Sequence, residues 1–138
     1  MSIWKFCKEQ LSFNNRVALM VIIDTKGSSP GKVGFKMAVS ENGQLKGSVG
    51  GGSAEYAAVE MAKEVLKNET ITPVLKRQVH SGDAEDSSGM ICSGEQTFVI
   101  LPLGENDVPN MGKLLAAEIK PREGCIFIDN KGLQFFSE

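Results

Sequence analysis

The chain has 138 residues, with 15 Lys+Arg against 17 Asp+Glu and a formal net charge of −2 at pH 7. The length fits one domain, and 41% hydrophobic with 23% charged residues is ordinary for a protein with a packed core, which excludes the disordered and fibrous classes. The near-neutral balance also argues against a general nucleic-acid binder. Glycine is unevenly placed, because eight of the 15 glycines fall between residues 27 and 52.

The cellular location is predicted from three features of the chain. Charged residues interrupt the first nine positions, so no export signal is expected. The longest wholly apolar run, Val17 to Ile23, is far shorter than the about 20 residues of a membrane span. Three widely spaced cysteines do not form a disulfide framework, and a single histidine without a Cys-x-x-Cys pair makes a zinc site improbable. We therefore expect a cytoplasmic protein with no resident metal and no membrane contact.

Two patterns predict the secondary structure of the first half. Apolar residues at helical spacing indicate a short amphipathic helix over 3–11. The apolar, β-branched run over 17–23 is typical of a strand that is buried on both faces. Segments 35–40 and 44–49 flank Asn42-Gly43, a pair that accepts the positive φ of tight turns, so they are predicted to form a hairpin.

Helix 54–67 is the clearest prediction of the second half, with Ser53 as the expected N-cap and Glu55 in its first turn. Pro109 near the start and Pro121 beyond the end delimit a further helix over 108–119. Alternating or continuous apolar residues predict the remaining strands, which are 74–80, 96–103 and the two arms of a final hairpin, 125–128 and 133–136.

Three helices and about seven strands that do not alternate regularly indicate an α+β fold with a mixed β-sheet, and not a doubly wound parallel sheet. No linker or internal repeat divides the chain. We therefore expect a single domain over residues 1–138.

The first candidate site is Gly50-Gly51-Gly52-Ser53, directly before a helix. Main-chain N–H groups at a helix start lack intrahelical partners and lie at the positive end of the dipole, so they favour an anion. The spacing fits neither a P-loop nor a Gly-x-Gly-x-x-Gly turn. The alternative is that these glycines serve only a sharp strand-to-helix turn.

A second candidate is the loop over 27–37, where Gly27, Ser28 and Ser29 precede Lys32 and Lys36. Hydroxyls, main-chain donors and two ammonium groups could cradle a phosphate or a polar heterocycle. A solvated loop whose lysines only maintain solubility is the competing interpretation.

The third candidate is Cys92, which lies between Gly89 and Gly94 just ahead of a strand. A thiol in such a loop can reach ligands and becomes reactive if cations lower its pKa. Free cysteine is more commonly a small buried hydrophobe, and Cys7 and Cys125 are interpreted in that way.

Taken together and in this order, the three segments resemble the N-terminal domain of the XdhC/CoxI family of maturation factors for xanthine dehydrogenase and carbon monoxide dehydrogenase. The first family block, a Gly-Ser-Ser-Pro turn with a following Gly and basic-Met pair, is similar to Gly27–Pro30, Gly34 and Lys36-Met37. The second block, Gly-x-Val-Ser-Gly-Gly-Cys-x-Glu, resembles residues 47–55. The third, a glycine-flanked cysteine and a strand ending in Pro-Leu, resembles residues 89–103.

The resemblance implies a cofactor chaperone, not an enzyme, that binds the molybdenum cofactor transiently and assists its sulfuration or its insertion into a xanthine dehydrogenase-type molybdoenzyme. A cysteine desulfurase would be a second partner. The implied site residues combine the thiol of Cys92 with the two glycine-containing segments: Gly27, Ser28, Ser29, Lys32, Lys36, Gly50, Gly51, Gly52, Ser53 and Glu55.

Two departures from the family pattern stand out. Ser53 occupies the position of the cysteine in the second block, which removes one thiol. The chain also ends without the C-terminal dinucleotide-type domain of full-length members, so we expect a stand-alone version of the N-terminal domain.

Two other functions are compatible with the residues. Cys92 could serve a thiol-dependent enzyme or a sulfur carrier as the nucleophile, in which case its pKa would lie below about 8.5. Alternatively, the domain could be a non-catalytic interaction module that binds a molybdoenzyme or forms a homodimer.

Overall fold

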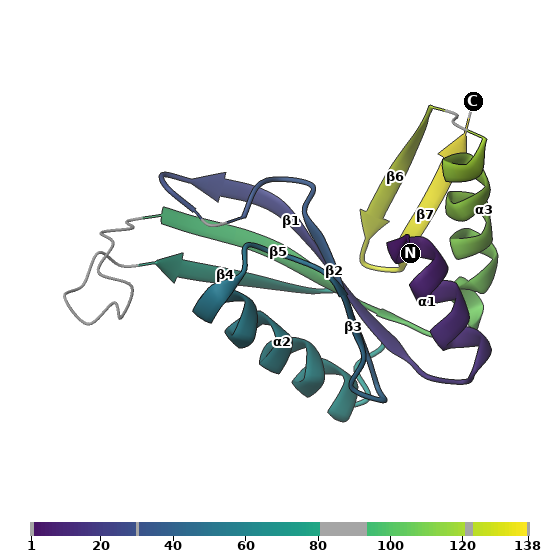
Figure 1. The fold of residues 1–138 in the computed structure, drawn as a ribbon, viewed down its shortest axis with the longest axis horizontal. Coiled ribbons are helices and arrows are strands. Elements are labelled where there is room, and N and C mark those ends of the chain that lie inside the picture. The colour runs from purple at the N-terminus through teal and green to yellow at the C-terminus, as the bar shows by residue number, and fades with distance from the viewer. Residues whose placement is uncertain (1, 30, 81–93, 121–122, 138) are drawn as a thin grey trace.

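The computed structural model describes residues 2–29, 31–80, 94–120 and 123–137, which form an α+β fold with three helices and seven strands (Figure 1). The fold class and the number of helices and strands are confirmed. The elements are α1 (Ile3–Ser12), β1 (Val17–Lys26), β2 (Lys36–Ser40), β3 (Leu45–Gly47), α2 (Gly52–Lys67), β4 (Val74–His80), β5 (Gly94–Leu103), the 3-10 helix η1 (Glu105–Asp107), α3 (Val108–Ile119), β6 (Gly124–Asp129) and β7 (Gly132–Ser137).

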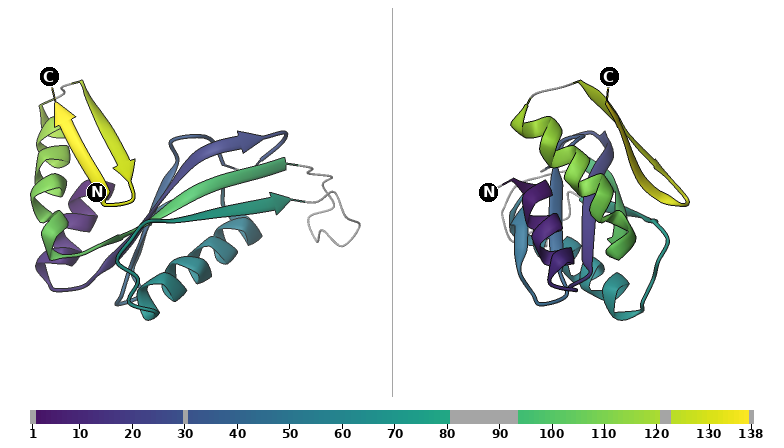
Figure 2. Two further views of the ribbon diagram at one scale, coloured as in Figure 1. Left: turned by 180° about the vertical axis from the view of Figure 1, so that it is seen from behind. Right: turned by 90° about the vertical axis from the view of Figure 1, so that its right-hand side faces the viewer.

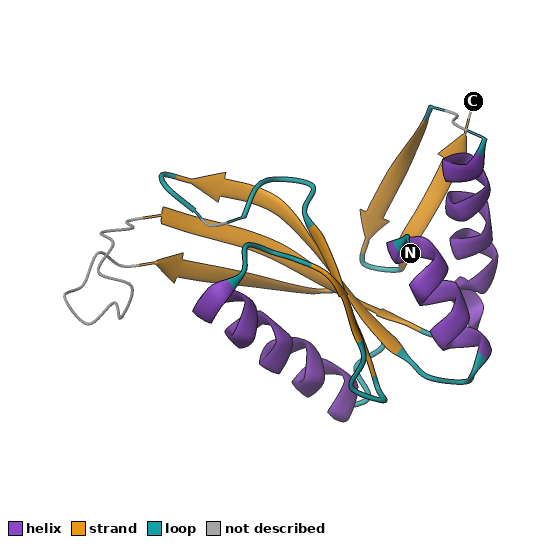
Figure 3. Ribbon diagram, viewed as in Figure 1, coloured by secondary structure: helices purple, strands orange, loops and turns teal. Residues whose placement is uncertain are grey.

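The strands are divided between two sheets, as Figure 3 shows. Five form one sheet in the order β3-β2-β1-β5-β4, and β6 pairs with β7 in a separate hairpin. Every pairing between described strands is antiparallel, so the expectation of one mixed sheet was wrong in this respect. For the pairs β2–β3 and β6–β7 the physical reason is local, because a short turn joins antiparallel strands whereas a parallel pair needs a long crossover.

Helices cover both faces of the large sheet and create two apolar cores (Figures 1 and 2). On one face lies α2, and on the other lie α1, α3 and β7. Strand β1 contributes to both, because Val17 and Leu19 point toward α1 and α3 whereas Met20 and Ile22 point toward α2. This alternation explains why its sequence is continuously apolar. It confirms burial on both faces from Val17 to Ile22, whereas Ile23 is 44% exposed.

Some element boundaries differ from those predicted. Strand β1 continues to Lys26, because after an irregularity at Ile23 its polar end pairs with residues 95–97 of β5. Helix α2 begins at Gly52, and Gly51 is the N-cap residue, with φ 74° and no side-chain cap. The prediction of Ser53 as the N-cap was therefore wrong. None of the helices in the described ranges has the length and apolar character needed to cross a bilayer.

The two described cysteines have different environments. Cys7, a residue of α1, is completely buried in the core, as predicted. Cys125 is exposed, so the prediction that it is a small buried hydrophobe was wrong. In the β6–β7 register it lies opposite Phe136, on the outer face of the hairpin, whereas Ile126 lies opposite Phe135 on the inner face. Successive side chains of a strand point to opposite faces, and the hairpin is covered on one face, so Cys125 on the other face is exposed.

Candidate functional site

The sheet topology brings the predicted loops together at one end of the large sheet (Figure 1, left). The loop after β1, the start of α2, the end of β4 and the start of β5 all lie there. They are far apart in the sequence and meet because β1 and β4 both flank β5. Cys92 lies outside the described residues. The first residue of β5, Gly94, is therefore the nearest described position to it along the chain.

Two buried glutamines connect these segments. Gln96 in β5 lies opposite Gln78 in β4, and its Nε2 donates a hydrogen bond of 2.8 Å to Gln78 Oε1. The same Nε2 donates to the carbonyl oxygen of Val49 at 3.2 Å, and Gln96 Oε1 accepts from the N–H of Gly31 at 3.1 Å. Gln78 Nε2 donates to the carbonyl oxygen of Ala54 in α2 at 2.9 Å. We call these two side chains the amide pair.

The loop after β1 packs closely against the sheet. An added Cβ at Gly31 would overlap the Ile22 side chain and come within 2.7 Å of the Val49 oxygen. An added Cβ at Gly94 would overlap the carbonyl oxygen of Ser28. The hydroxyl of Ser29 donates to the Gly31 oxygen at 2.7 Å, which stabilises the turn from within. These two glycines are therefore needed for close approach between main chains.

The start of α2 has a different character, because the Cβ positions of Gly51 and Gly52 are open. Gly50, Gly51 and Gly52 all have positive φ, at 126°, 74° and 65°. Nothing lies within 4 Å of an added Cβ at Gly51 or Gly52. Within the described ranges, no hydrogen-bond acceptor is found for the N–H groups of these two residues. Donors in this arrangement, at the positive end of a 16-residue helix, can bind an anion.

Glu55 occupies part of this helix start. Its carboxylate Oε1 accepts from the N–H of Val49 at 3.3 Å, so one main-chain donor beside the helix is already in use. A carboxylate in the first turn also suits the helix dipole, as the sequence predicted. Ser53 is the second residue of the helix.

The two lysines of the candidate loop are placed differently. Lys32 is exposed in the loop that the amide pair holds beside α2. Lys36 begins β2 on the opposite face of the sheet, where its Nζ lies 6.0 Å from the centroid of the Trp4 ring and donates to the Gly34 oxygen at 2.9 Å. The structure therefore does not bring Lys36 to the start of α2, because successive residues of a strand point to opposite faces.

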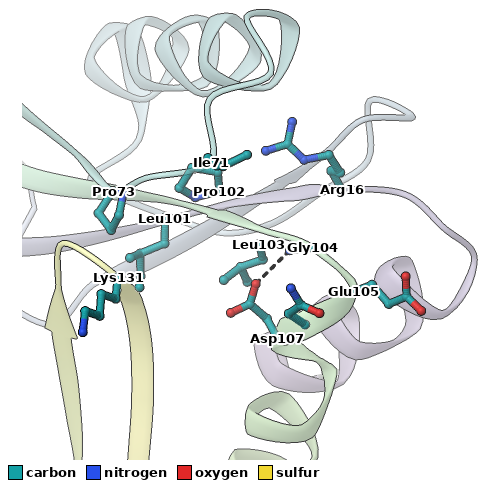
Figure 4. A pocket seen from close by; sticks show the side chains of 12 residues that line it. Arg16, Ile71, Pro73, Leu101, Pro102, Leu103, Gly104, Glu105, Asp107 and Lys131 are labelled. Atoms are coloured by element: carbon teal, nitrogen blue, oxygen red, sulfur yellow. Dashed lines mark hydrogen bonds between the residues drawn. The ribbon is translucent and has the colours of Figure 1, made fainter.

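A separate hollow of about 390 Å³ lies at the other end of the sheet (Figure 4). Arg16, Pro73, Pro102 and Lys131 are among its lining residues, which include none of the predicted site residues that the structure describes. Burial raises the pKa of the Asp107 carboxyl there, although the hydrogen bond from the N–H of Gly104 opposes this shift. The hollow is therefore separate from the described part of the predicted site.

Sequence reasoning missed the amide pair. Gln96 is completely buried and Gln78 is 8% exposed. One signal was available, because Gln96 shares its strand face with Phe98 and Ile100, and a polar residue in such a series needs a buried partner. The partner and the loops that it binds depend on register, which the sequence pattern did not specify.

A match to a known protein family covers part of this site. Residues 11–76 match the family model described as the XdhC and CoxI family. These residues are an XdhC/CoxI family domain. The match includes the first two of the three segments that suggested the resemblance, and it contains the loop after β1 and the start of α2. The family assignment of the sequence analysis is thus confirmed.

The fold of the chain is also found in a solved structure from Bacillus halodurans, described as a xanthine dehydrogenase. The two agree with a TM-score of 0.66 and 19% sequence identity, over 100% of this chain and 45% of the other. The chain thus spans less than half of the length of that structure, and at this identity the likeness establishes the fold alone. A search of curated proteins finds no match.

Proposed function

We propose that this XdhC/CoxI domain binds the molybdenum cofactor by its phosphate at the start of α2, and assists the sulfuration of the cofactor or its insertion into a xanthine dehydrogenase-type molybdoenzyme. The observation that carries the proposal is the pair of N–H groups at Gly51 and Gly52, for which the described ranges hold no acceptor, beside glycines whose Cβ positions are open. The family is linked to maturation of this cofactor, which supports the choice of ligand.

The chemistry of the described residues suits a phosphate-bearing pterin. Two main-chain donors and the dipole of α2 stabilise the phosphate without a basic surface, which agrees with a net charge of −2. Lys32 supplies a cation from the neighbouring loop, and Glu55 limits how much negative charge the site accepts. In the proposal, the thiol of Cys92 contacts the molybdenum or its sulfur as a soft ligand.

Anaerobic retention of the cofactor tests the proposal. The protein is mixed with molybdenum cofactor released from a molybdoenzyme, desalted, and analysed for molybdenum and pterin. We expect the wild type to retain the cofactor and Lys32→Glu to weaken retention by about tenfold, because a charge-assisted hydrogen bond becomes a repulsion. Lys63→Glu, a charge reversal at an exposed position of α2, is the matched control and should retain it.

The role of Cys92 is tested in the same assay. Cys92→Ala should retain less cofactor than the wild type. Equal retention would remove the thiol from the site and leave a phosphate site alone, whereas absence of retention by the wild type would contradict the proposed function as a whole.

A further inference from the structure

The amide pair connects the segments of the proposed site, and each of its hydrogen bonds has a defined donor and acceptor. Gln96 Oε1 accepts from Gly31, while both hydrogens of its Nε2 are donated, one to Val49 and one to Gln78. Gln78 then donates to Ala54 in the first turn of α2. One side chain therefore holds the loop after β1 and the segment before α2 at a set separation, and the second extends this connection to the helix.

A neutral amide is the only common side-chain group that can make these contacts at Gln96. It offers one acceptor and two donors at the end of a flexible stem. An apolar residue of equal length would leave the N–H of Gly31 and the oxygen of Val49 without partners in the interior, which is costly. A carboxylate would place a negative oxygen against the oxygens of Val49 and Gln78.

We propose that Gln96, supported by Gln78, is a positioning residue that fixes the Gly31 loop beside the glycine-rich start of α2 so that Lys32 and the N–H groups of Gly51 and Gly52 can bind one anion. This inference rests on the proposed function for its ligand. The amide pair does not touch the ligand, since it is buried beneath the two segments. It acts by holding their main chains.

The substitution Gln96→Glu gives the inference a distinctive signature. Burial and the facing oxygens raise the pKa of a carboxyl at this position. At high pH the ionised group repels Val49 and Gln78, so the loop separates from α2 and anion affinity falls. At low pH the protonated acid accepts from Gly31 and donates once, which restores part of the connection. Gln96→Met removes every hydrogen bond at any pH.

The surrounding titratable groups set the baseline of this experiment. Around Gln96 these are Glu55 on α2 and Lys32 in the loop, and His80 is the last residue of β4. On the other face of the sheet lie Asp24, Lys26 and Glu95, with Glu95 paired to Arg77. The variants share all of them with the wild type, so the readout is the ratio of the dissociation constant of a variant to that of the wild type at the same pH.

Sulfate is the probe, because its charge is the same across the pH range used, unlike that of phosphate. Its dissociation constant is measured by NMR titration at about pH 5.5 and about pH 8. For Gln96→Glu we expect a ratio to wild type of at least about ten at the higher pH and a several-fold smaller ratio at the lower pH. For Gln96→Met we expect about the same raised ratio at both. Gln134→Glu, the same exchange on the exposed face of β7, should give a ratio near one.

A ratio near one for Gln96→Glu at the higher pH would overturn the inference. Ratios for Gln96→Glu and Gln96→Met that are equal at both pH values would do so too, because a merely structural role predicts no recovery. If Gln96→Glu fails to fold, Gln78→Met provides a milder test that keeps the contacts of Gln96 with Gly31 and Val49, and it should weaken sulfate binding by a few-fold. Unchanged binding in Gln78→Met would then remove the second glutamine from the account.

Failure of the proposed function is distinguished by hydrogen exchange of the Gly31 amide, which needs no ligand. In Gln96→Met this amide should exchange at least about tenfold faster than in the wild type, because its acceptor is lost. A wild type that does not bind sulfate but shows this difference would contradict the anion site and leave the positioning of the loop intact. Unchanged exchange would contradict the positioning itself.

Discussion

At the residue scale, Gly31 is the position where two segments leave no room for a side chain. It is buried, and its Cβ would meet Ile22, Val49 and Gln96. We expect Gly31→Ala to lower the free energy of unfolding by about 1–3 kcal/mol, since main chain and core side chains must move apart. Urea denaturation measures this change.

Gly112 provides the matched control for that substitution. It lies inside α3 and has nothing within 4 Å of an added Cβ. Gly112→Ala should raise the free energy of unfolding by up to about 1 kcal/mol, because alanine loses less backbone entropy in a helix. A Gly31→Ala variant as stable as the wild type would show that the loop is not packed against the sheet in this way.

The cysteines give a second prediction at this scale, and it concerns reactivity. Burial raises the pKa of the Cys7 thiol to about 12, so the reactive thiolate is scarce at neutral and mildly alkaline pH. Iodoacetamide at about pH 8 should therefore modify Cys125, which is exposed, and leave Cys7 unmodified in the folded protein. Peptide mass spectrometry distinguishes the two, and urea should make Cys7 reactive. Equal rates for both thiols in the folded state would refute this placement of α1.

At the scale of elements, the β6–β7 hairpin depends on one of its faces. A two-stranded hairpin is at most marginally stable alone. Its inner face contributes Leu133 and Phe135 to the core with α1 and α3, and Asn110 of α3 donates to the Leu133 oxygen at 3.0 Å. The outer face carries Phe127 and Phe136, whose ring centroids lie 5.6 Å apart.

Two substitutions of phenylalanine in this hairpin should therefore differ. Phe135→Ala should lower the free energy of unfolding by about 3 kcal/mol, because it leaves a cavity in the core. Phe127→Ala, at 57% exposure, should cost less than about 1 kcal/mol. Urea denaturation of both variants makes the comparison. Equal losses would mean that the hairpin does not pack through its inner face.

How much of these elements the sequence predicts depends on whether the deciding interaction is local. Helix α3 has the bounds predicted from Pro109 and the apolar spacing, and β4 has those predicted from its apolar pattern. The predicted start of α2 was wrong because it rested on the preference of serine for the N-cap. In the structure, glycines with positive φ lead into the helix instead. The exposure of Cys125 depends on which face of the hairpin is covered, which is decided by distant residues.

At the scale of the whole molecule, the arrangement of strands turns separate motifs into neighbours. The sequence predicts the motifs, and the resemblance it supports is confirmed by the family match over residues 11–76. It does not predict that β5 lies between β1 and β4, which is what joins Gly31, Val49 and Ala54 through the amide pair. The opposite direction of Lys36 has the same origin, since strand register decides which face a side chain occupies.

The central claim is that the loop after β1 and the start of α2 form one site for a phosphate-bearing cofactor. The most direct test is an anaerobic NMR titration of the ¹⁵N-labelled wild type with molybdenum cofactor. The amide signals of Gly31, Gly51 and Gly52 should shift together along one binding curve, while those of Gly43 and Gly112, which lie elsewhere in the fold, should stay in place. Shifts that leave Gly51 and Gly52 unaffected, or that follow separate curves in the two segments, would contradict a single site.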